Sequence, residues 1–265
     1  MSVGSSFGAV IAVTGLAFEA SIAAGIGITV VRGNDSRRLK ASLESAVARG
    51  TRGIISFGIA GGLAPDLSPG NWVVPTAVIV GGRRVLTCPI WSRKLMEMMP
   101  GARGGEITGV DAPVANPRDK RALYRGTGAA AVDMESHVAA DVAHAVGVPF
   151  AAFRIIIDPV HRELPPAALV ELRPDGTPDV PEVLRSVVRR PRQLPALVRT
   201  ARDAQIARSA LLRSRRLLGP HFGFPDSSKH LVDMPREDVF SAPLAVELNF
   251  RHHIPLGSYA AQTDG

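Results

Sequence analysis

The sequence predicts an α/β protein, because segments typical of strands alternate with segments typical of helices. The strand-like segments are short, rich in Val and Ile, and bounded by glycines, as buried strands are. The 265 residues include 26 Gly and 21 Pro, which favours a compact protein with many turns. With 46% hydrophobic residues, the chain can bury a sizeable core.

The first three elements are two strands and a helix. Residues 8–14 and 27–31 have the composition of buried or hairpin-like strands. Residues 36–49 are typical of a helix, with Ser36 as the candidate N-cap and Gly50 as the residue that stops it.

The alternation continues in the middle of the chain. Residues 54–57 are a short strand that runs into a glycine-rich loop over residues 58–65, and residues 71–75 begin another strand. Residues 135–146 have helical composition, and residues 150–157 form an apolar strand. We expect these elements to make up the core of one domain.

Two arginine-rich helices are expected after the core, at residues 182–190 and 195–218, on either side of Pro191. Their only acids are Glu182 and Asp203. The interleaved leucines and cations are compatible with a position on an anionic membrane surface, and equally with a packed helix that has a charged outer face. The arginines are Arg185, Arg189, Arg190, Arg192, Arg199, Arg202, Arg208, Arg213, Arg215 and Arg216.

The pattern of elements divides the chain into two parts. Residues 1–219 form a single domain, in which residues 182–219 are the arginine-rich helices. Residues 220–265 hold several prolines and show no sustained period, so an irregular C-terminal extension is expected.

Charge and cysteine content limit the partners and the compartment. The net charge of +7 calls for an acidic partner: nucleic acid, an anionic membrane surface or a charged substrate. Aromatic residues make up only 5%, which does not favour stacking on nucleic acid, and no such partner is expected.

The single Cys88 forms neither an internal disulfide nor a thiolate metal site. No spanning helix or signal segment is evident, so we expect a cytoplasmic protein, with peripheral attachment to the inner membrane surface left open.

Two carboxylates stand where ligands bind in open α/β sheets. Glu135 opens a helix and Asp158 ends an apolar strand, so both can converge on one crevice, an arrangement suited to glycosidic-bond cleavage. Asp158 is the candidate acid, because burial raises a carboxyl pKa, and the alternative is a turn residue before Pro159. Glu135 is the candidate partner of ribose hydroxyls, with Met134 on the sugar face. The alternative is that Asp133 and Glu135 only occupy a helix first turn.

Other polar residues are weaker candidates. Glu19 follows the first strand and could polarise a water for attack on the sugar, or could be solvated at a helix start. The glycines of residues 58–65 let the backbone approach a ligand, but they do not match a dinucleotide motif. His137, Asp141 and His144 share one helix face, which is more typical of a polar solvated face than of a metal site, and no metal is expected.

Three blocks in order resemble the nucleoside phosphorylase and nucleosidase superfamily over about residues 8–160. Gly58-Ile59-Ala60-Gly61-Gly62-Leu63-Ala64-Pro65, with Gly70 and Val73-Val74, is similar to the glycine-rich block of methylthioadenosine/S-adenosylhomocysteine nucleosidases. Val132-Asp133-Met134-Glu135 is similar to their ribose-binding Val-Glu-Met-Glu. Arg154 to Asp158 is similar to their Arg-x-x-Ser-Asp strand end.

The resemblance implies a three-layer α/β/α fold with a central mixed sheet, as in nucleoside phosphorylases. It implies that Asp158 protonates the base, that Glu19 activates water, and that Glu135 binds the ribose hydroxyls. It also implies that Asp111-Ala112-Pro113-Val114 lines the base pocket and that the backbone of Val114 reads the purine edge. The implied substrate-binding set is Glu135, Met134, Asp133, Val114, Pro113, Gly58, Ile59, Ala60 and Gly61.

The chain departs from the family pattern at three places. Ile59 replaces a serine that helps to hold the nucleophile, and Pro113 stands where an aromatic often stacks on the base. No arginine occurs in residues 56–59, where phosphate-using relatives place one. These departures favour water over phosphate as the nucleophile.

Residues 158–219 are most similar to the hopanoid-biosynthesis-associated phosphorylases, whose implied substrate is adenosylhopane. The sequence therefore predicts an enzyme that releases adenine from a 5′-substituted adenosine, adenosylhopane, without metal or organic cofactor. A phosphorolytic purine nucleoside phosphorylase and a non-catalytic nucleoside- or lipid-binding protein of the membrane surface are the alternatives. Relatives form dimers or larger assemblies, so a homo-oligomer is expected.

Overall fold

The computed structural model describes residues 8–33, 35–170 and 179–225. The strands are β1 (Ala9–Thr14), β2 (Ile28–Arg32), β3 (Thr51–Gly62), β4 (Trp72–Val73), β5 (Ala77–Val80), β6 (Arg83–Leu86), β7 (Glu106–Gly109), β8 (Ala131–Asp133) and β9 (Phe150–Asp158). The helices are α1 (Ala17–Ala23), α2 (Ser36–Ala48), α3 (Pro89–Met98), α4 (Pro117–Thr127), α5 (Ser136–Val146), α6 (Val180–Arg189) and α7 (Leu194–Leu217). Short 3-10 turns, η1 (Pro166–Ala168) and η2 (Pro191–Gln193), flank α6.

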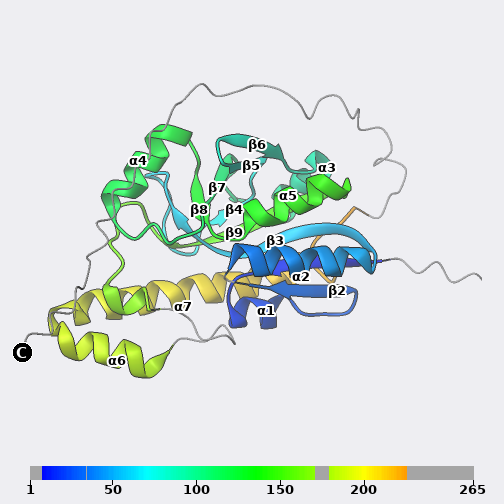
Figure 1. The fold of residues 1–265 in the computed structure, drawn as a ribbon. Coiled ribbons are helices and arrows are strands. Elements are labelled where there is room, and N and C mark those ends of the chain that lie inside the picture. The colour runs from blue at the N-terminus through cyan, green and yellow to red at the C-terminus, as the bar shows by residue number, and fades with distance from the viewer. Residues whose placement is uncertain (1–7, 34, 171–178, 226–265) are drawn as a thin grey trace, which may run out of the picture.

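One mixed sheet runs through the described part of the chain (Figure 1). Its strands follow the order β2-β1-β3-β8-β7-β5-β6, with β9 paired to β3 and β4 paired to β9. The β1–β2, β1–β3, β3–β9, β5–β7 and β7–β8 pairs are parallel, whereas β8 runs antiparallel to β3. The ends of β3, β8 and β9 therefore meet at one place in the sheet.

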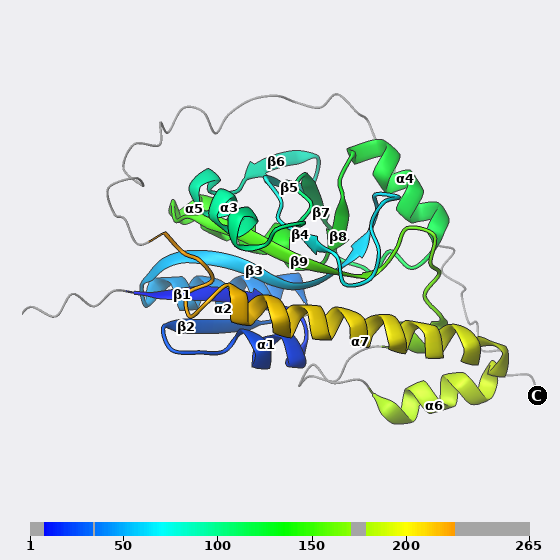
Figure 2. The same ribbon diagram turned by 180° about the vertical axis from the view of Figure 1, so that it is seen from behind.

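Helices cover both faces of the sheet, which confirms the predicted three-layer α/β/α fold. On one face, α2 and α5 pack through residues such as Leu39, Leu43 and Ala139. On the other face, which Figure 2 shows from behind, α1, α3 and α7 pack through residues such as Trp91 and Leu211. The burial of apolar surface on both faces is the main favourable contribution to folding.

Two predicted element ends need correction. The N-cap of α2 is Asp35 and not Ser36, because the Asp35 side chain accepts a hydrogen bond from the Arg38 amide at 2.8 Å. The glycine-rich loop predicted from residue 58 is in fact the end of β3, which runs to Gly62. These glycines remain in the strand because β8 and β9 pair with the backbone of Gly61 from both sides.

The C-terminal helices lie where they were predicted, with Pro191 between them in η2. The packed part of the chain continues past the predicted domain end at residue 219, since Phe222 and Phe224 are buried in the core. Trp91 Nε1 donates a hydrogen bond to the Phe222 carbonyl at 2.8 Å. Residues 226–265 of the predicted extension lie outside the described residues. Within the described ranges, none of the helices has the length and apolar character needed to cross a membrane.

Candidate active site

Arg154 is the centre of a buried polar cluster at the meeting point of β3, β8 and β9. It stands opposite Gly58 of β3, and its side chain is fully buried. Its Nε lies 2.6 Å from Oδ2 of Asp133, and its Nη2 lies 3.3 Å from Oε2 of Glu135. The Nη2 atom also donates to Ser56 Oγ at 2.5 Å. A buried guanidinium needs this degree of pairing, because a buried charge without partners is costly.

Glu19 is buried in the same cluster and is not the solvated helix-start residue considered as its alternative. Its Oε2 accepts hydrogen bonds from the amides of Gly15 at 2.9 Å and Leu16 at 2.8 Å, while its Oε1 accepts one from the Ile59 amide at 2.7 Å. The carboxylate therefore joins the start of α1 to β3. A Cβ at position 58 would collide with Glu19 Oε1 and stand 2.7 Å from Arg154 Nη1, so this close approach requires glycine.

The cluster has more carboxylates than cations. Burial raises the pKa of Glu135 to about 8; Arg154 opposes this rise, and the neighbouring Asp133 and Glu19 add to it. Burial also raises the pKa of Glu19, again against the effect of Arg154. A glutamate with a raised pKa is a stronger base than an ordinary one, so the cluster can take up a proton near neutral pH.

Asp133 is held in place by Ser136 and Arg154. Its Oδ1 accepts a hydrogen bond from the Ser136 amide at 3.0 Å, and its Oδ2 accepts one from Ser136 Oγ at 2.5 Å in addition to the Arg154 contact. These contacts start α5 directly after β8. They place Glu135, the N-cap residue of α5, beside Gly15.

Asp158 forms a second buried polar site at the end of β9. It lies opposite Gly61 after a register shift between β3 and β9, and it is ion-paired with the buried Lys120 of α4. Burial raises the pKa of Asp158, and the Lys120 ammonium opposes that rise. The register shift adds one residue to β9 between Ile156 and Asp158, so Asp158 shares the face of its partner Gly61, opposite to the face of Arg154 and its partner Gly58.

The remaining predicted site residues are distributed around these two sites. Ile59 contributes its backbone to Glu19, and Ala60 is part of the hydrophobic core under α2 and α5. Met134 is half-buried between Asp133 and Glu135. These placements leave the roles of the residues as predictions.

The loop predicted to line the base pocket follows β7. Pro113 is exposed, and Val114 packs against the small core cluster that includes Leu63. Asp111 accepts a hydrogen bond from Ser36 Oγ at 2.5 Å and lies 3.2 Å from Nε2 of His137. A cavity of about 200 Å³ opens beside it, lined by Asp35, Ser36, Arg37 and Asp111.

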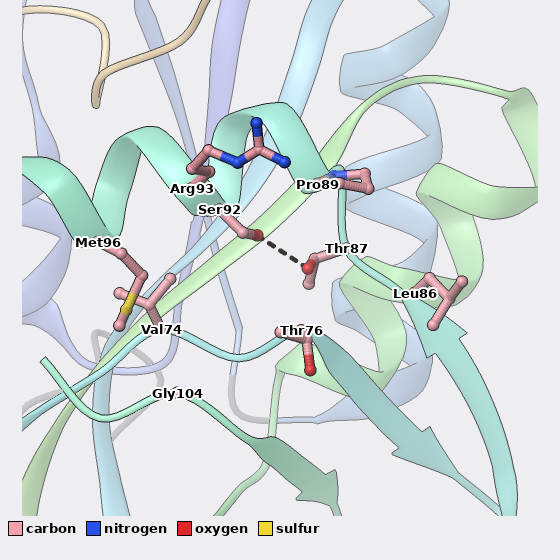
Figure 3. Close-up of a pocket in the computed structure, with 9 residues that line it drawn as sticks. All are labelled: Val74, Thr76, Leu86, Thr87, Pro89, Ser92, Arg93, Met96 and Gly104. Carbon is pink, nitrogen blue, oxygen red and sulfur yellow. Dashed lines mark hydrogen bonds between the residues drawn. The ribbon is translucent and has the colours of Figure 1, made fainter.

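The larger of the two cavities, of about 380 Å³, has no residue of either polar site in its lining, and Figure 3 shows the residues that line it. It is located where β5 and β7 begin, next to α3, whereas the candidate site residues lie toward the other ends of those strands. In its lining, Ser92 Oγ donates a hydrogen bond of 2.8 Å to Thr87 Oγ1. Its lining residues are Val74, Thr76, Leu86, Thr87, Pro89, Ser92, Arg93, Met96 and Gly104, and none of them is a predicted site residue.

The helix face that carries His137, Asp141 and His144 is divided between different contacts. His137 packs against Gly109, and Asp141 pairs with Arg83 at 2.5 Å. Within the described ranges, no three His, Cys, Asp or Glu side chains lie close enough together to hold a metal ion.

Sequence reasoning missed Lys120 and the central position of Arg154. A signal was present for Arg154, because a single arginine inside the apolar strand Phe150–Asp158 must be paired when the strand is buried. Lys120 gave no such signal, since it lies in a charged helix that begins Pro117-Arg118-Asp119.

Comparisons with known proteins agree with this fold. The chain is similar to Helicobacter pylori 5′-methylthioadenosine/S-adenosylhomocysteine nucleosidase, with 15% identity, 85% of this chain and 98% of that chain covered, and a TM-score of 0.57. It is similar to the corresponding Neisseria meningitidis nucleosidase in complex with methylthio-immucillin-A (15% identity, 78% and 97% covered, TM-score 0.54). It is also similar to Helicobacter pylori futalosine hydrolase (15% identity, 79% and 97% covered, TM-score 0.54).

At these identities, the solved structures establish the fold alone. No curated protein matches the sequence. The model of the phosphorylase superfamily matches residues 33–190, which is more than half of the chain. The chain therefore belongs to the phosphorylase superfamily, whose enzymes cleave N-glycosidic bonds.

Proposed function

We propose that this protein releases adenine from a 5′-substituted adenosine by cleaving its N-glycosidic bond. The observation that carries the proposal is the pair of buried polar sites on β9, with Arg154 and its carboxyl groups at one site and Asp158 at the other, at the end of the strand. Cleavage leaves positive charge on the sugar and negative charge on the base, so groups that stabilise both ends accelerate it. The names of the similar nucleosidases, which contain 5′-methylthioadenosine and S-adenosylhomocysteine, support this substrate class.

The sugar end of the reaction is assigned to Glu19 and Glu135. Glu135 binds the ribose hydroxyls, and Met134 packs on the sugar. Glu19 accepts a proton from a water molecule as the water oxygen bonds to C1′. The C1′–N9 bond breaks, its electron pair passes to the purine, and Asp158 donates a proton to N7. The carboxyl oxygens around Arg154 suit the positive charge that develops on the sugar.

Water is favoured over phosphate as the nucleophile because the guanidinium of Arg154 is already paired with protein groups. Its guanidinium already contacts Asp133, Glu135 and two serine hydroxyls, so it is not free to bind a phosphate. Phosphorolysis remains the alternative that the family includes, and phosphate dependence is therefore part of the test.

A large apolar 5′ substituent, as in adenosylhopane, is supported by the surface of α6 and α7. Val180, Leu184 and Val188 follow one another at four-residue spacing on one side of α6, and Leu184 is 59% and Val188 80% exposed. Figure 2 shows α6 lying beside α7 and apart from the sheet, and none of its residues is buried. Leu194 and Val198 of α7 are also exposed.

Arginines flank this apolar stripe, and two acids, Asp179 and Glu182, lie near its start. Apolar side chains surrounded by cations suit an anionic membrane surface, whereas a second copy of the same face would bring like charges together. We therefore assign the stripe to a membrane surface that holds a lipid substrate, and we expect the homo-oligomer to use a different face.

The proposal is tested by adenine release from adenosylhopane and from methylthioadenosine, each with and without phosphate. Release that is independent of phosphate supports a nucleosidase, and strict phosphate dependence supports a phosphorylase. If neither substrate releases adenine while methylthioadenosine still binds, the protein is a nucleoside-binding protein and the proposal is wrong.

The membrane surface is tested separately by sedimentation with phosphatidylglycerol vesicles. L184E is expected to weaken binding, because it places a carboxylate in the apolar stripe. The matched control is L86E, since Leu86 is 51% exposed but lies in β6 of the sheet. Equal binding by both variants would remove the stripe from the proposal.

A further inference from the structure

Lys120 is an unusual residue because its side chain is fully buried, although lysine is among the residues least often buried. Its ammonium group has three donors, and three oxygens accept from it: Oδ2 of Asp158, the carbonyl of Arg162 at 3.1 Å and the carbonyl of Pro159 at 3.3 Å. Such complete pairing is what allows a charge to be buried.

These contacts connect α4 with the end of β9 and the turn that follows. The Arg162 amide donates to the Pro159 carbonyl at 2.9 Å and closes that turn. Two residues later, the Leu164 amide donates to the carbonyl of Ala115, in the loop that leads into α4. Lys120 therefore holds Asp158 and the turn after β9 against α4, and the Leu164–Ala115 bond holds the same turn against the loop that leads into α4.

The two carboxylate oxygens of Asp158 have different surroundings. Oδ2 is taken by Lys120, and no donor among the described residues bonds to Oδ1. Both oxygens lie beside Gly61, with Oδ1 at 3.5 Å and Oδ2 at 3.8 Å from the position that a Cβ there would take, so the carboxyl group faces a residue without a side chain. Lys120 thus holds the carboxyl group by one oxygen and leaves the other without a protein donor among the described residues.

Three charged groups act on Asp158 from the surrounding elements: Lys120 from α4, Arg162 from the turn after β9, and Asp203 from α7. Arg162 and Asp203 form an ion pair of 2.6 Å and act on Asp158 in opposite directions. Lys120 has the largest effect of the three, and it lowers the pKa that burial raises.

We propose that Lys120 is a positioning residue for base release, which holds Asp158 by one carboxylate oxygen and leaves the other oxygen for N7 of the purine. This inference rests on the proposed function. When the Asp158 O–H bond breaks and the N7–H bond forms, the carboxylate that remains is the one that Lys120 is already placed to stabilise. Lys120 therefore makes the buried Asp158 a stronger acid toward the departing base.

The test is the pH dependence of kcat for adenine release from methylthioadenosine. K120M removes the cation, so Asp158 keeps its proton to higher pH and donates it less readily. We expect kcat at pH 7 to fall about 10-fold or more. We expect the alkaline limb of the pH profile to shift to higher pH by about one unit. K120R is expected to keep the limb near its wild-type position. R121M is the matched control, since it removes one exposed cation from the same helix.

A purely structural role for Lys120 predicts a lower rate with an unmoved alkaline limb, and that result would overturn the inference. The D158N background provides a second test that does not depend on the fold of K120M alone. If Lys120 acts through Asp158, then K120M has no further effect on the residual release by D158N, whereas a full additional loss contradicts the inference. Absence of adenine release by the wild-type protein would contradict the proposed function itself.

Discussion

Glu135 is expected to make the stability of the protein depend on pH. Its pKa rises from 4.5 to about 8 on folding, so at pH 7 the group is protonated in the folded protein and ionised in the unfolded chain. The unfolded chain therefore binds fewer protons, and stability falls as the pH rises from 4.5 toward 8. At about 1.4 kcal/mol per pH unit, Glu135 lowers the free energy of unfolding by about 3 kcal/mol between pH 4.5 and pH 7.

Glu135→Gln removes this titration while keeping the size of the side chain. The free energy of unfolding of E135Q, relative to wild type, should be about 2.5 kcal/mol more favourable at pH 7 than at pH 5. The measurement is urea denaturation of both proteins at the two pH values, with E97Q as the control because Glu97 is exposed. An E135Q-to-wild-type difference that is the same at pH 5 and pH 7 would refute the reasoning. In kinetics, E135Q is expected to weaken ribose binding, and unchanged constants would remove Glu135 from the site.

Three further substitutions test other parts of the structure. D158N should reduce adenine release by about 10²- to 10⁴-fold with an unchanged circular dichroism spectrum, and full activity would end its assignment as the acid. G58A should destabilise the protein by about 1–3 kcal/mol in urea denaturation, because its Cβ collides with Glu19 and crowds Arg154; a neutral effect would contradict this packing. F222A should cost about 3–5 kcal/mol, because Phe222 is fully buried against Phe57, and thermal denaturation will show whether this segment belongs to the core.

The sequence was sufficient where local pattern and tertiary packing agree. The helix over residues 135–146 and the strand over residues 150–157 were predicted almost to their ends, because apolar periodicity and flanking glycines both mark them. Asp35 and Ser36 are both good N-caps, and only the side-chain geometry separates them. The strand segment Gly58–Gly62 was predicted as a loop because glycine is rare in strands, and the pairing that keeps it extended comes from β8 and β9, far away in sequence.

Several elements between residues 77 and 127 were not predicted at all. β5, β6 and β7 have four residues each, which is too short for a clear alternation. Helix α4 carries charges on most of its surface, so its one buried lysine could not be told from its exposed neighbours. The partner that explains Lys120 is Asp158, 38 positions later, and only the folded chain brings the two together.

The two buried polar sites on β9 differ in the charged groups that they hold, and that difference matches the chemistry proposed for them. At the first site, one guanidinium faces three carboxyl groups, and burial, with Asp133 and Glu19 adding to its effect, raises the pKa of Glu135 to about 8. The carboxyl oxygens of such a site favour the positive charge that develops on a sugar as its glycosidic bond breaks. At the second site, a single carboxyl is matched by a single ammonium, so the loss of a proton from Asp158 creates a complete ion pair. The same strand therefore positions a site assigned to the sugar and, at its end, a site that releases a proton to the base.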